Sequence, residues 1–293
     1  MLPPEILRQV RRIEILTTRI VNETMAGRYE SVFKGHGMEF HEVREYQPGD
    51  DVRAIDWNVT ARTGRPHLKR FVEERELTVL CLVDLSRSMA FGSVQQLKQR
   101  IATELCAVLA FAAIKNHDRV GLLLFTDRIE RYLPPKKGAT HVLRVIREVL
   151  SFEPAGRGTN LRGALDYLTR VARRKAVVFL VSDFLSGDEG LRGALAVANK
   201  RHDVILVHLV DPREEQVPPL GRLRLEDLED GRSVVVQSAR AAVRAAYAKR
   251  ADAHRRWLTD VARSAGADVV EVRTDRSYLE PLVKFFRMRS ARR

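Results

Sequence analysis

The stretch from Thr78 to Gly92 carries the residues of this chain whose types and spacing could do chemistry. Its sequence, TVLCLVDLSRSMAFG, begins as an unbroken apolar run and ends with a carboxylate and two hydroxyls at alternate positions, Asp84, Ser86 and Ser88. A turning loop can aim alternate side chains to one side, and carboxylate and hydroxyl oxygens are the hard ligands that Mg²⁺ or Mn²⁺ prefers. The pattern therefore indicates a divalent-cation site.

Two other segments carry polar side chains that would complete such a site. A second apolar run, VVFLVSDF, also ends in a carboxylate, Asp183, and the segment GRGTNL between the two runs places Thr159 just before a helical pattern. Open α/β sheets bind ligands at the carboxyl ends of strands where the strand order reverses. If the two runs are neighbouring parallel strands, Asp84 and Asp183 face one crevice and the Thr159 loop closes over it.

Ordinary structural roles could also explain each of these residues taken alone. Asp and Ser at the end of a strand often bond to the backbone of the following turn. Thr159 or Asn160 could act only as the N-cap of the next helix. The occurrence of all five residues in this order, each at an expected strand or helix end, favours the metal site.

The elements that must position these residues alternate in type after Leu77. Apolar runs of strand length alternate with segments of helical spacing, which predicts an α/β fold with a doubly wound, mostly parallel sheet covered by helices on both faces. We expect strands at 77–83, 120–125, 176–181, 204–210 and 269–272, a hairpin around Asp230-Gly231, and helices at 94–112, 142–150, 161–171, 191–198, 238–264 and 279–288.

The first 76 residues differ from the rest in their pattern of apolar and charged residues. We therefore assign residues 1–76 to an N-terminal extension and residues 77–293 to the α/β domain. Helical spacing over residues 5–25 predicts one helix. Aromatic and β-branched residues then alternate with charged residues between recurrent turn signals, which predicts a small strand-rich segment. Trp57 and Phe71 are expected to anchor its packing.

A group of carboxylates in the extension has two interpretations. Asp50, Asp51 and Asp56 lie close together in the sequence, next to Trp57. They could cap turns and pair with nearby arginines. Alternatively, the three carboxylates and Trp57 could form an acidic recognition edge that binds a partner protein.

Composition places the chain among ordinary soluble proteins. It has 293 residues, of which 45% are hydrophobic and 30% charged, which suffices for one large or two modest domains with a real core. No apolar run approaches the roughly 18–20 residues of a membrane span, and the N-terminus lacks a signal-peptide pattern, so we expect a cytoplasmic protein. Cys81 and Cys106 lie in apolar patterns and are expected to be buried thiols.

Two other functional classes stay open. The formal net charge of +13 favours acidic partners, which could include nucleic acid or an anionic surface. Aromatic residues are only 6% and are not interleaved with basic ones, which gives little capacity for base stacking. The chain has no GxxxxGK[ST] phosphate loop and no GxSxG elbow. A cation held by carboxylates could still activate water, so a Mg²⁺-dependent hydrolase is the other alternative.

The motifs DLSRS, GTN and SD resemble the metal-ion-dependent adhesion site of von Willebrand factor type A domains, whose pattern is Asp-x-Ser-x-Ser followed by a distant Thr and a distant Asp. By this resemblance, Ser86, Ser88 and Thr159 would ligate a metal directly. Asp84 and Asp183 would ligate it directly or through water. The resemblance also implies an open sixth coordination position, which a carboxylate of a partner protein fills.

The upstream stretch GHGMEFHEVREYQPGDDVRAIDWNVTARTGRPHLKRFVEERE resembles the hallmark of the bacterial domain-of-unknown-function family number fifty-eight, which joins it to a von Willebrand A-like domain. The resemblance covers Gly35 to about Asp183. Such members often stand beside MoxR-type AAA+ ATPases, which implies a non-enzymatic, metal-dependent adaptor in a chaperone-like or assembly role. The chain departs from the adhesion-site pattern at Phe184, where glycine is usual, and this puts the shape of that loop in question.

Overall fold

The computed structural model describes residues 4–20, 38–73, 76–94, 96–186 and 190–292, which form two compact units. The smaller unit contains two strands, a 3-10 helix and an α-helix: β1 (Met38–Glu45), η2 (Val52–Ala54), α3 (Trp57–Thr63) and β2 (His67–Glu73). The larger unit contains α1 (Pro4–Ile20) and the described chain from Thr78 onward. The first helix therefore groups with the α/β unit rather than with the strand-rich segment.

The larger unit is built on one six-stranded sheet. Its strands are β3 (Thr78–Asp84), β4 (Arg119–Phe125), β5 (Ile129–Lys136), β6 (Val177–Ser182), β7 (Asp203–Val210) and β10 (Asp268–Arg273), in the order β10-β7-β6-β3-β4-β5. All neighbours pair in parallel except β4 and β5, which are antiparallel. The predicted doubly wound, mostly parallel sheet is confirmed, and β5 is an edge strand that the sequence pattern did not indicate.

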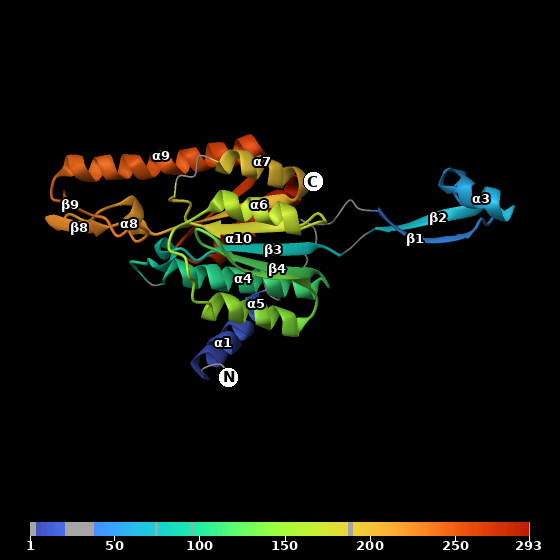
Figure 1. Cartoon of the computed structure of the whole chain (residues 1–293), viewed down its shortest axis with the longest axis horizontal. Helices are drawn as coiled ribbons and strands as arrows, with labels where there is room; N and C mark the ends of the chain where they lie inside the picture. The colour runs from blue at the N-terminus through green and yellow to red at the C-terminus, as the bar shows by residue number, and fades with distance from the viewer. Residues whose placement is uncertain (1–3, 21–37, 74–75, 95, 187–189, 293) are drawn as a thin grey trace. The chain divides into compact units, whose positions relative to one another are not determined.

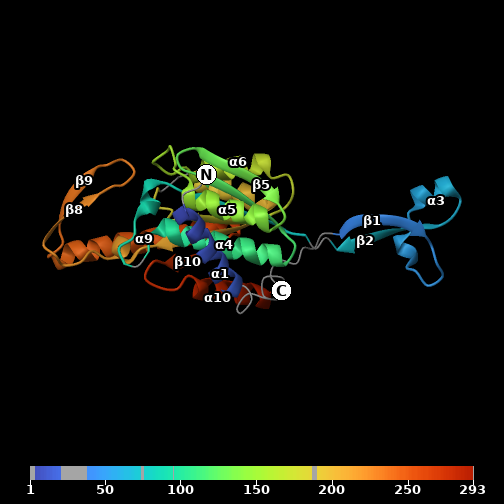
Figure 2. The same cartoon turned by 90° about the horizontal axis from the view of Figure 1, so that it is seen from below.

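Helices cover both faces of this sheet (Figure 1). One face carries α6 (Leu161–Val171), α7 (Leu191–Arg201) and α9 (Ala241–Ala265), and the other carries α4 (Lys98–Lys115), α5 (Ala139–Ser151) and α1, as Figures 1 and 2 show. The last helix, α10 (Leu279–Ala291), packs beside β10. Since α1 packs on α4 and α5, it adds a further layer to the second face.

The strands that lead to the candidate site are buried on both faces. Every residue of β6 and all but the first of β3 are buried. Leu80 and Leu82 belong to one core cluster with residues of α6, α7 and α9, and the alternation of side chains along a strand turns Cys81 toward the opposite face. Cys81 and Cys106 are both buried and free, as predicted.

The helix α4 begins later than its apolar spacing suggested. It starts at Lys98, and the side chains of Val94 and Leu97 are 55% and 47% exposed. The preceding segment is held in another conformation, because the backbone N–H of Ser93 donates to Asp211 Oδ2 at 2.8 Å and that of Lys98 donates to the carbonyl of Phe91 at 3.0 Å. These contacts, one of them between residues 118 positions apart, override the helical pattern of the segment.

The region between β7 and α9 forms a separate hairpin. A short helix, α8 (Pro212–Glu215), is followed by β8 (Arg222–Glu226) and β9 (Ser233–Gln237), which pair antiparallel. The hairpin predicted around Asp230-Gly231 is confirmed, and Gly231 has a φ of 74° in its turn. None of the described helices combines the length and apolarity that a membrane crossing requires.

The smaller unit is an antiparallel β1–β2 pair with α3 in the connection between its strands. Helix α3 ends at Gly64, whose φ of 71° suits glycine. Trp57 is 68% exposed, so the expectation that it anchors the packing is wrong. The side chain of Phe71 lies outside the described residues, as does the predicted helix beyond Ile20.

A glycine in the loop before α6 provides a test of how that loop is held. The backbone N–H of Gly156 donates to Glu130 Oε1 at 2.7 Å, and a Cβ at this position would collide with the side chains of Thr126 and Asp127. We expect Gly156→Ala to lower the free energy of unfolding by about 1–3 kcal/mol, measured by urea denaturation. Gly193→Ala is the matched control, because nothing lies within 4 Å of a Cβ there. In α7 it should raise stability by about 0.5–1 kcal/mol, and equal stabilities of the two variants would contradict the packing described.

Candidate functional site

The sheet brings the predicted site residues together at the carboxyl ends of β3 and β6. These strands are adjacent and parallel, so Asp84 at the end of β3 and Asp183 just after β6 lie at one edge. The loop before α6 reaches the same edge, where Thr159 Oγ1 lies 3.4 Å from Asp84 Oδ2. Ser86 and Ser88 follow β3, and their hydroxyl oxygens are 3.0 Å apart. All five predicted side chains therefore meet at this edge of the sheet.

The carboxyl group of Asp84 is fully buried. Its Oδ1 accepts from the backbone N–H of Ser86 at 2.8 Å, and its Oδ2 accepts from the Ser182 hydroxyl at 2.6 Å. Burial, and then the charge of Asp183, raise the pKa of Asp84 to about 7 despite these hydrogen bonds. The negative charge at this position is therefore poorly compensated by the protein alone.

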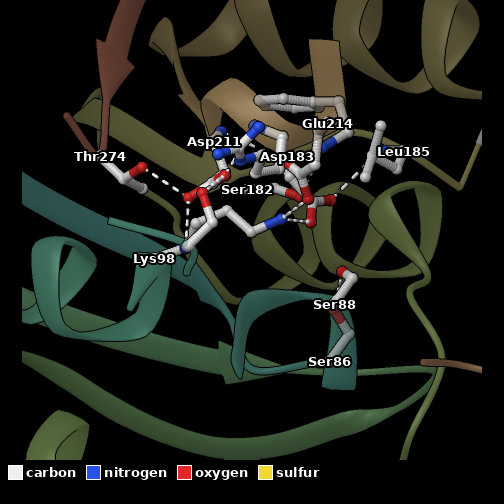
Figure 3. A network of polar contacts seen from close by, with 12 residues as sticks. Ser86, Ser88, Lys98, Ser182, Asp183, Leu185, Asp211, Glu214 and Thr274 are labelled. Carbon is white, nitrogen blue, oxygen red and sulfur yellow. Dashed lines mark hydrogen bonds and ion pairs between the residues drawn. The ribbon is translucent and has the colours of Figure 1, made fainter. Parts of the chain in front are cut away.

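Asp183 is paired with a buried cation that the sequence analysis missed. Figure 3 shows the Lys98 side chain reaching Asp183 and Glu214, with Nζ 2.6 Å from Asp183 Oδ2 and 2.5 Å from Glu214 Oε1. Burial opposes the charge of Asp183, but the ammonium group of Lys98 outweighs it and the pKa of Asp183 is lowered. Burial likewise opposes the charge of Lys98, yet the two carboxylates raise its pKa. The sequence could have indicated that Lys98 lies on the buried face of its helix, because it has helical spacing to the apolar positions 101 and 105.

The third member of this network, Glu214, is positioned by a capped turn. Asp211 is the N-cap of α8, and the backbone N–H of Asp211 donates back to Glu214 Oε2 at 3.1 Å. Asp211 also accepts hydrogen bonds from the Ser93 hydroxyl and, at 2.7 Å, from the Thr274 hydroxyl (Figure 3). Glu214 therefore uses one carboxylate oxygen to cap and the other to bind Lys98, while burial raises its pKa.

Phe184 has a backbone conformation that favours glycine, at the position where the adhesion-site pattern usually has glycine. Its φ is 56°, in the left-handed region that costs a residue with a Cβ about 1–2 kcal/mol. The side chain is fully buried, with its ring centroid 5.9 Å from that of His208, and this burial offsets the strain. The backbone N–H of Leu185 then donates to Asp183 Oδ1 at 3.2 Å. The loop at Phe184 thus folds back on the carboxylate of Asp183.

The donor set suits a hard divalent cation. It consists of two carboxylates and three hydroxyls, and the separations of 3.0 Å and 3.4 Å between neighbouring oxygens are near the ~3 Å edge of an octahedron with Mg²⁺–O bonds of about 2.0–2.1 Å. Within the described ranges, no group of three or more His, Cys, Asp or Glu side chains is arranged to hold a metal. A cation at this edge would therefore depend on the serine and threonine hydroxyls.

The other predicted partner-binding residues lie in the smaller unit, where the carboxylates serve the local fold. Asp50 accepts from Arg44 at 2.7 Å, Asp51 caps η2 through the N–H of Arg53, and Asp56 caps α3. These contacts are the turn-capping and ion-pairing roles of the first interpretation. Trp57 projects from the same unit and is exposed. An acidic recognition edge stays a prediction.

Comparison with known proteins identifies relatives over most of the chain. The family model described as "Protein of unknown function DUF58" matches residues 42–257, which span both units. The uncharacterised protein Rv1480 of Mycobacterium tuberculosis is 33% identical over 285 residues, covering 96% of this chain and 89% of that protein.

Among solved structures, BatB from Bacteroides thetaiotaomicron aligns with a TM-score of 0.51 at 17% identity, covering 74% of this chain and 100% of that one. A von Willebrand factor type A protein from Catenulispora acidiphila aligns with a TM-score of 0.45 at 12% identity, covering 75% of this chain and 43% of that one. The first match supports the fold alone, and the second is too distant to carry an argument.

The buried ion pairs of Lys98 can be tested by removing the cation. We expect Lys98→Met to lower the free energy of unfolding by about 3–5 kcal/mol, because it leaves buried carboxylates without a counter-charge. Thermal and urea denaturation measure the loss. Lys284→Met on α10 is the control, since Lys284 is exposed and its substitution should change stability by no more than about 0.5 kcal/mol. A loss at Lys98 no larger than at Lys284 would show that the ion pairs are not formed.

Proposed function

The chain belongs to the DUF58 family, and we propose that it is a non-enzymatic protein-binding module whose contact with its partner depends on Mg²⁺ or Mn²⁺. The observation that carries this proposal is the meeting of five oxygen-bearing side chains from three separate segments at one sheet edge. The burial of Asp84, with a pKa of about 7, supports it, because a cation would offset the charge that the protein leaves uncompensated.

Each of the five residues has a defined part in this proposal. The hydroxyls of Ser86, Ser88 and Thr159 would hold the cation together with the carboxylates of Asp84 and Asp183. When bound, the cation would supply an attraction for an anionic oxygen of the partner. The bond from Ser86 N–H to Asp84 Oδ1, at 2.8 Å, keeps the loop turned so that the serine hydroxyls stay at the site. Lys98 orients Asp183 through Oδ2, and Oδ1, which accepts from the Leu185 N–H, keeps a second lone pair for a cation.

The partner in this proposal offers a carboxylate, and family resemblance makes a MoxR-type AAA+ ATPase the favoured candidate. The net charge of +13 would attract an acidic protein surface over distances of about a Debye length. Charge of this kind raises the rate of encounter more than it raises affinity. The cation site would then supply the specific contact.

Catalysis is not part of the proposal. The histidines beside Asp183, His208 and His254, have ring centroids 6.0 Å apart and are largely buried. Burial, and then the charge of His254, lower the pKa of His208 to about 3, so that it is a weak base near neutral pH. General base catalysis works best with a group whose pKa lies near the working pH.

The metal site is tested directly with Asp84→Asn, which keeps the shape of the side chain and removes its charge. Wild-type protein should bind Mg²⁺ in isothermal titration calorimetry, and Asp84→Asn should not. At a Mg²⁺ concentration about 100-fold above the dissociation constant, binding should add about 2.7 kcal/mol to the free energy of unfolding. Equal Mg²⁺ affinity of the two proteins would show that Asp84 is not a ligand.

Asp84→Asn should also change how the free energy of unfolding depends on pH when EDTA has removed divalent cations. The folded-state pKa of Asp84 is raised to about 7 from the ordinary 3.8, so the folded protein binds more protons than the unfolded one between these values. The contribution of Asp84 to stability should therefore be present below pH 4 and be lost as the pH rises to 7. The corresponding fall in stability, measured by urea denaturation, should be absent from Asp84→Asn.

Dependence of partner binding on the cation tests the proposed function as a whole. A purified MoxR-type AAA+ ATPase should bind immobilised wild-type protein in MgCl₂, and binding should be lost in EDTA or with Asp84→Asn. The reason is that the partner's carboxylate would have no cation to contact. Binding of the ATPase or of duplex DNA that ignores EDTA but falls steeply with salt would instead support a charge-driven binder.

A further inference from the structure

A carboxylate from a distant part of the chain lies over the candidate metal site. Glu229, in the turn between β8 and β9, accepts a hydrogen bond from the Thr159 hydroxyl at 2.7 Å. Its other oxygen lies 3.7 Å from the place that a Cβ on Gly158 would occupy. Since Thr159 Oγ1 is also 3.4 Å from Asp84 Oδ2, the Glu229 carboxylate and the Asp84 carboxylate approach the same hydroxyl.

The turn that carries Glu229 is built to present it. Asp227 Oδ1 accepts from the backbone N–H of Glu229 at 2.8 Å, and the backbone N–H of Asp227 donates to the carbonyl of Arg232 at 2.8 Å. Gly231 supplies the left-handed residue that the turn requires, with a φ of 74°. Of the acidic residues in the turn, Asp227 and Asp230 are exposed, whereas Glu229 is partly buried against the site.

The hairpin has little apolar packing to hold it in place. No residue of β8 or β9 is buried, and Val234 and Val235 are 58% and 63% exposed. A two-stranded hairpin is marginally stable by itself. Its base is fixed where the backbone N–H of Ser238 donates to the carbonyl of Gly221 at 2.7 Å. The hydrogen bond between Thr159 and Glu229 therefore attaches this turn to the loop before α6.

The electrostatics of this contact favour a cation between the groups. The Thr159 hydroxyl lies between two carboxylate oxygens, 2.7 Å from Glu229 Oε1 and 3.4 Å from Asp84 Oδ2. The carboxylates of Asp84 and Glu229 therefore face each other across this hydroxyl, whereas the ammonium group of Lys98 contacts Asp183. Binding of a divalent cation would turn the repulsion between them into attraction.

We propose that Glu229 is an internal ligand of the metal site and occupies the position that a partner's carboxylate takes. The inference rests on the proposed function. It specifies the partner further, because the incoming acidic side chain has to displace Glu229 and the β8–β9 hairpin has to open. Binding of the cation then favours the closed position of the hairpin. By the same coupling, closure of the hairpin raises the affinity for the cation.

The test compares Glu229→Gln with Glu226→Gln by titration with MgCl₂. The amide of the first variant would keep an acceptor for the Thr159 hydroxyl but lose the charge, so Glu229→Gln should bind Mg²⁺ at least about 10-fold more weakly than wild type, a loss that even outer-shell partners produce. Glu226 is exposed in the same hairpin, and its variant should bind as wild type does. Hydrogen exchange supplies a second readout. Mg²⁺ should slow exchange of the amides of residues 222–237 in wild type and Glu226→Gln, but not in Glu229→Gln.

The outcomes separate this inference from the proposed function. If wild type and Glu229→Gln bind Mg²⁺ equally and the cation leaves exchange in the hairpin unchanged, Glu229 is not a ligand, and the inference is overturned while the metal site stands. If wild type binds no Mg²⁺, the proposed function fails and this inference fails with it. Weaker binding together with the loss of hairpin protection, confined to Glu229→Gln, supports the internal ligand.

Discussion

Two carboxylates buried at the ends of adjacent parallel strands are the constraint on which the rest of this structure depends. Removing a charge from water costs several kcal/mol, so each group needs a partner or a proton. Asp183 has the ammonium group of Lys98 at 2.6 Å. Asp84 accepts hydrogen bonds from the Ser86 N–H at 2.8 Å and from the Ser182 hydroxyl at 2.6 Å. Burial and the charge of Asp183 nevertheless raise its pKa to about 7. A buried carboxylate whose charge is incompletely compensated contributes little to the stability of the fold, but it is a suitable ligand for a cation.

Much of the surrounding structure serves to hold Lys98 at this position. The side chain can reach Asp183 because α4 begins at Lys98, after a segment that Asp211 fixes through Ser93. The same Asp211 caps α8 and thereby orients Glu214, the second carboxylate on Lys98. One capping residue therefore determines both the start of a core helix and the geometry of a buried ion network. On the other side of Asp183, the strained backbone of Phe184 is kept in place by the burial of its ring.

The elements of the α/β unit could largely be foreseen because buried parallel strands read as continuous apolar runs and amphipathic helices have a clear period. The features that the sequence pattern did not predict correctly have physical causes. The strand β5 contains Pro134 and Pro135, which a paired strand tolerates at the sheet edge. Helix α4 starts late because tertiary hydrogen bonds hold the preceding segment. Trp57 is the first residue of the short helix α3 and is 68% exposed, because the face of such a helix that a residue occupies is set by packing and not by residue type.

The sequence by itself determined which side chains stand at strand ends, because Asp84 and Asp183 each terminate an apolar run and the adjacency of their strands follows from a general rule of open sheets. Only the tertiary structure decided what surrounds them. Lys98 pairs with a carboxylate 85 residues away, and Thr159 donates to one 70 residues away. Contacts over such separations leave no local period in the sequence, since they arise only when distant elements pack. The charge balance of the site, and the carboxylate of Glu229 that covers it, are therefore properties of the fold.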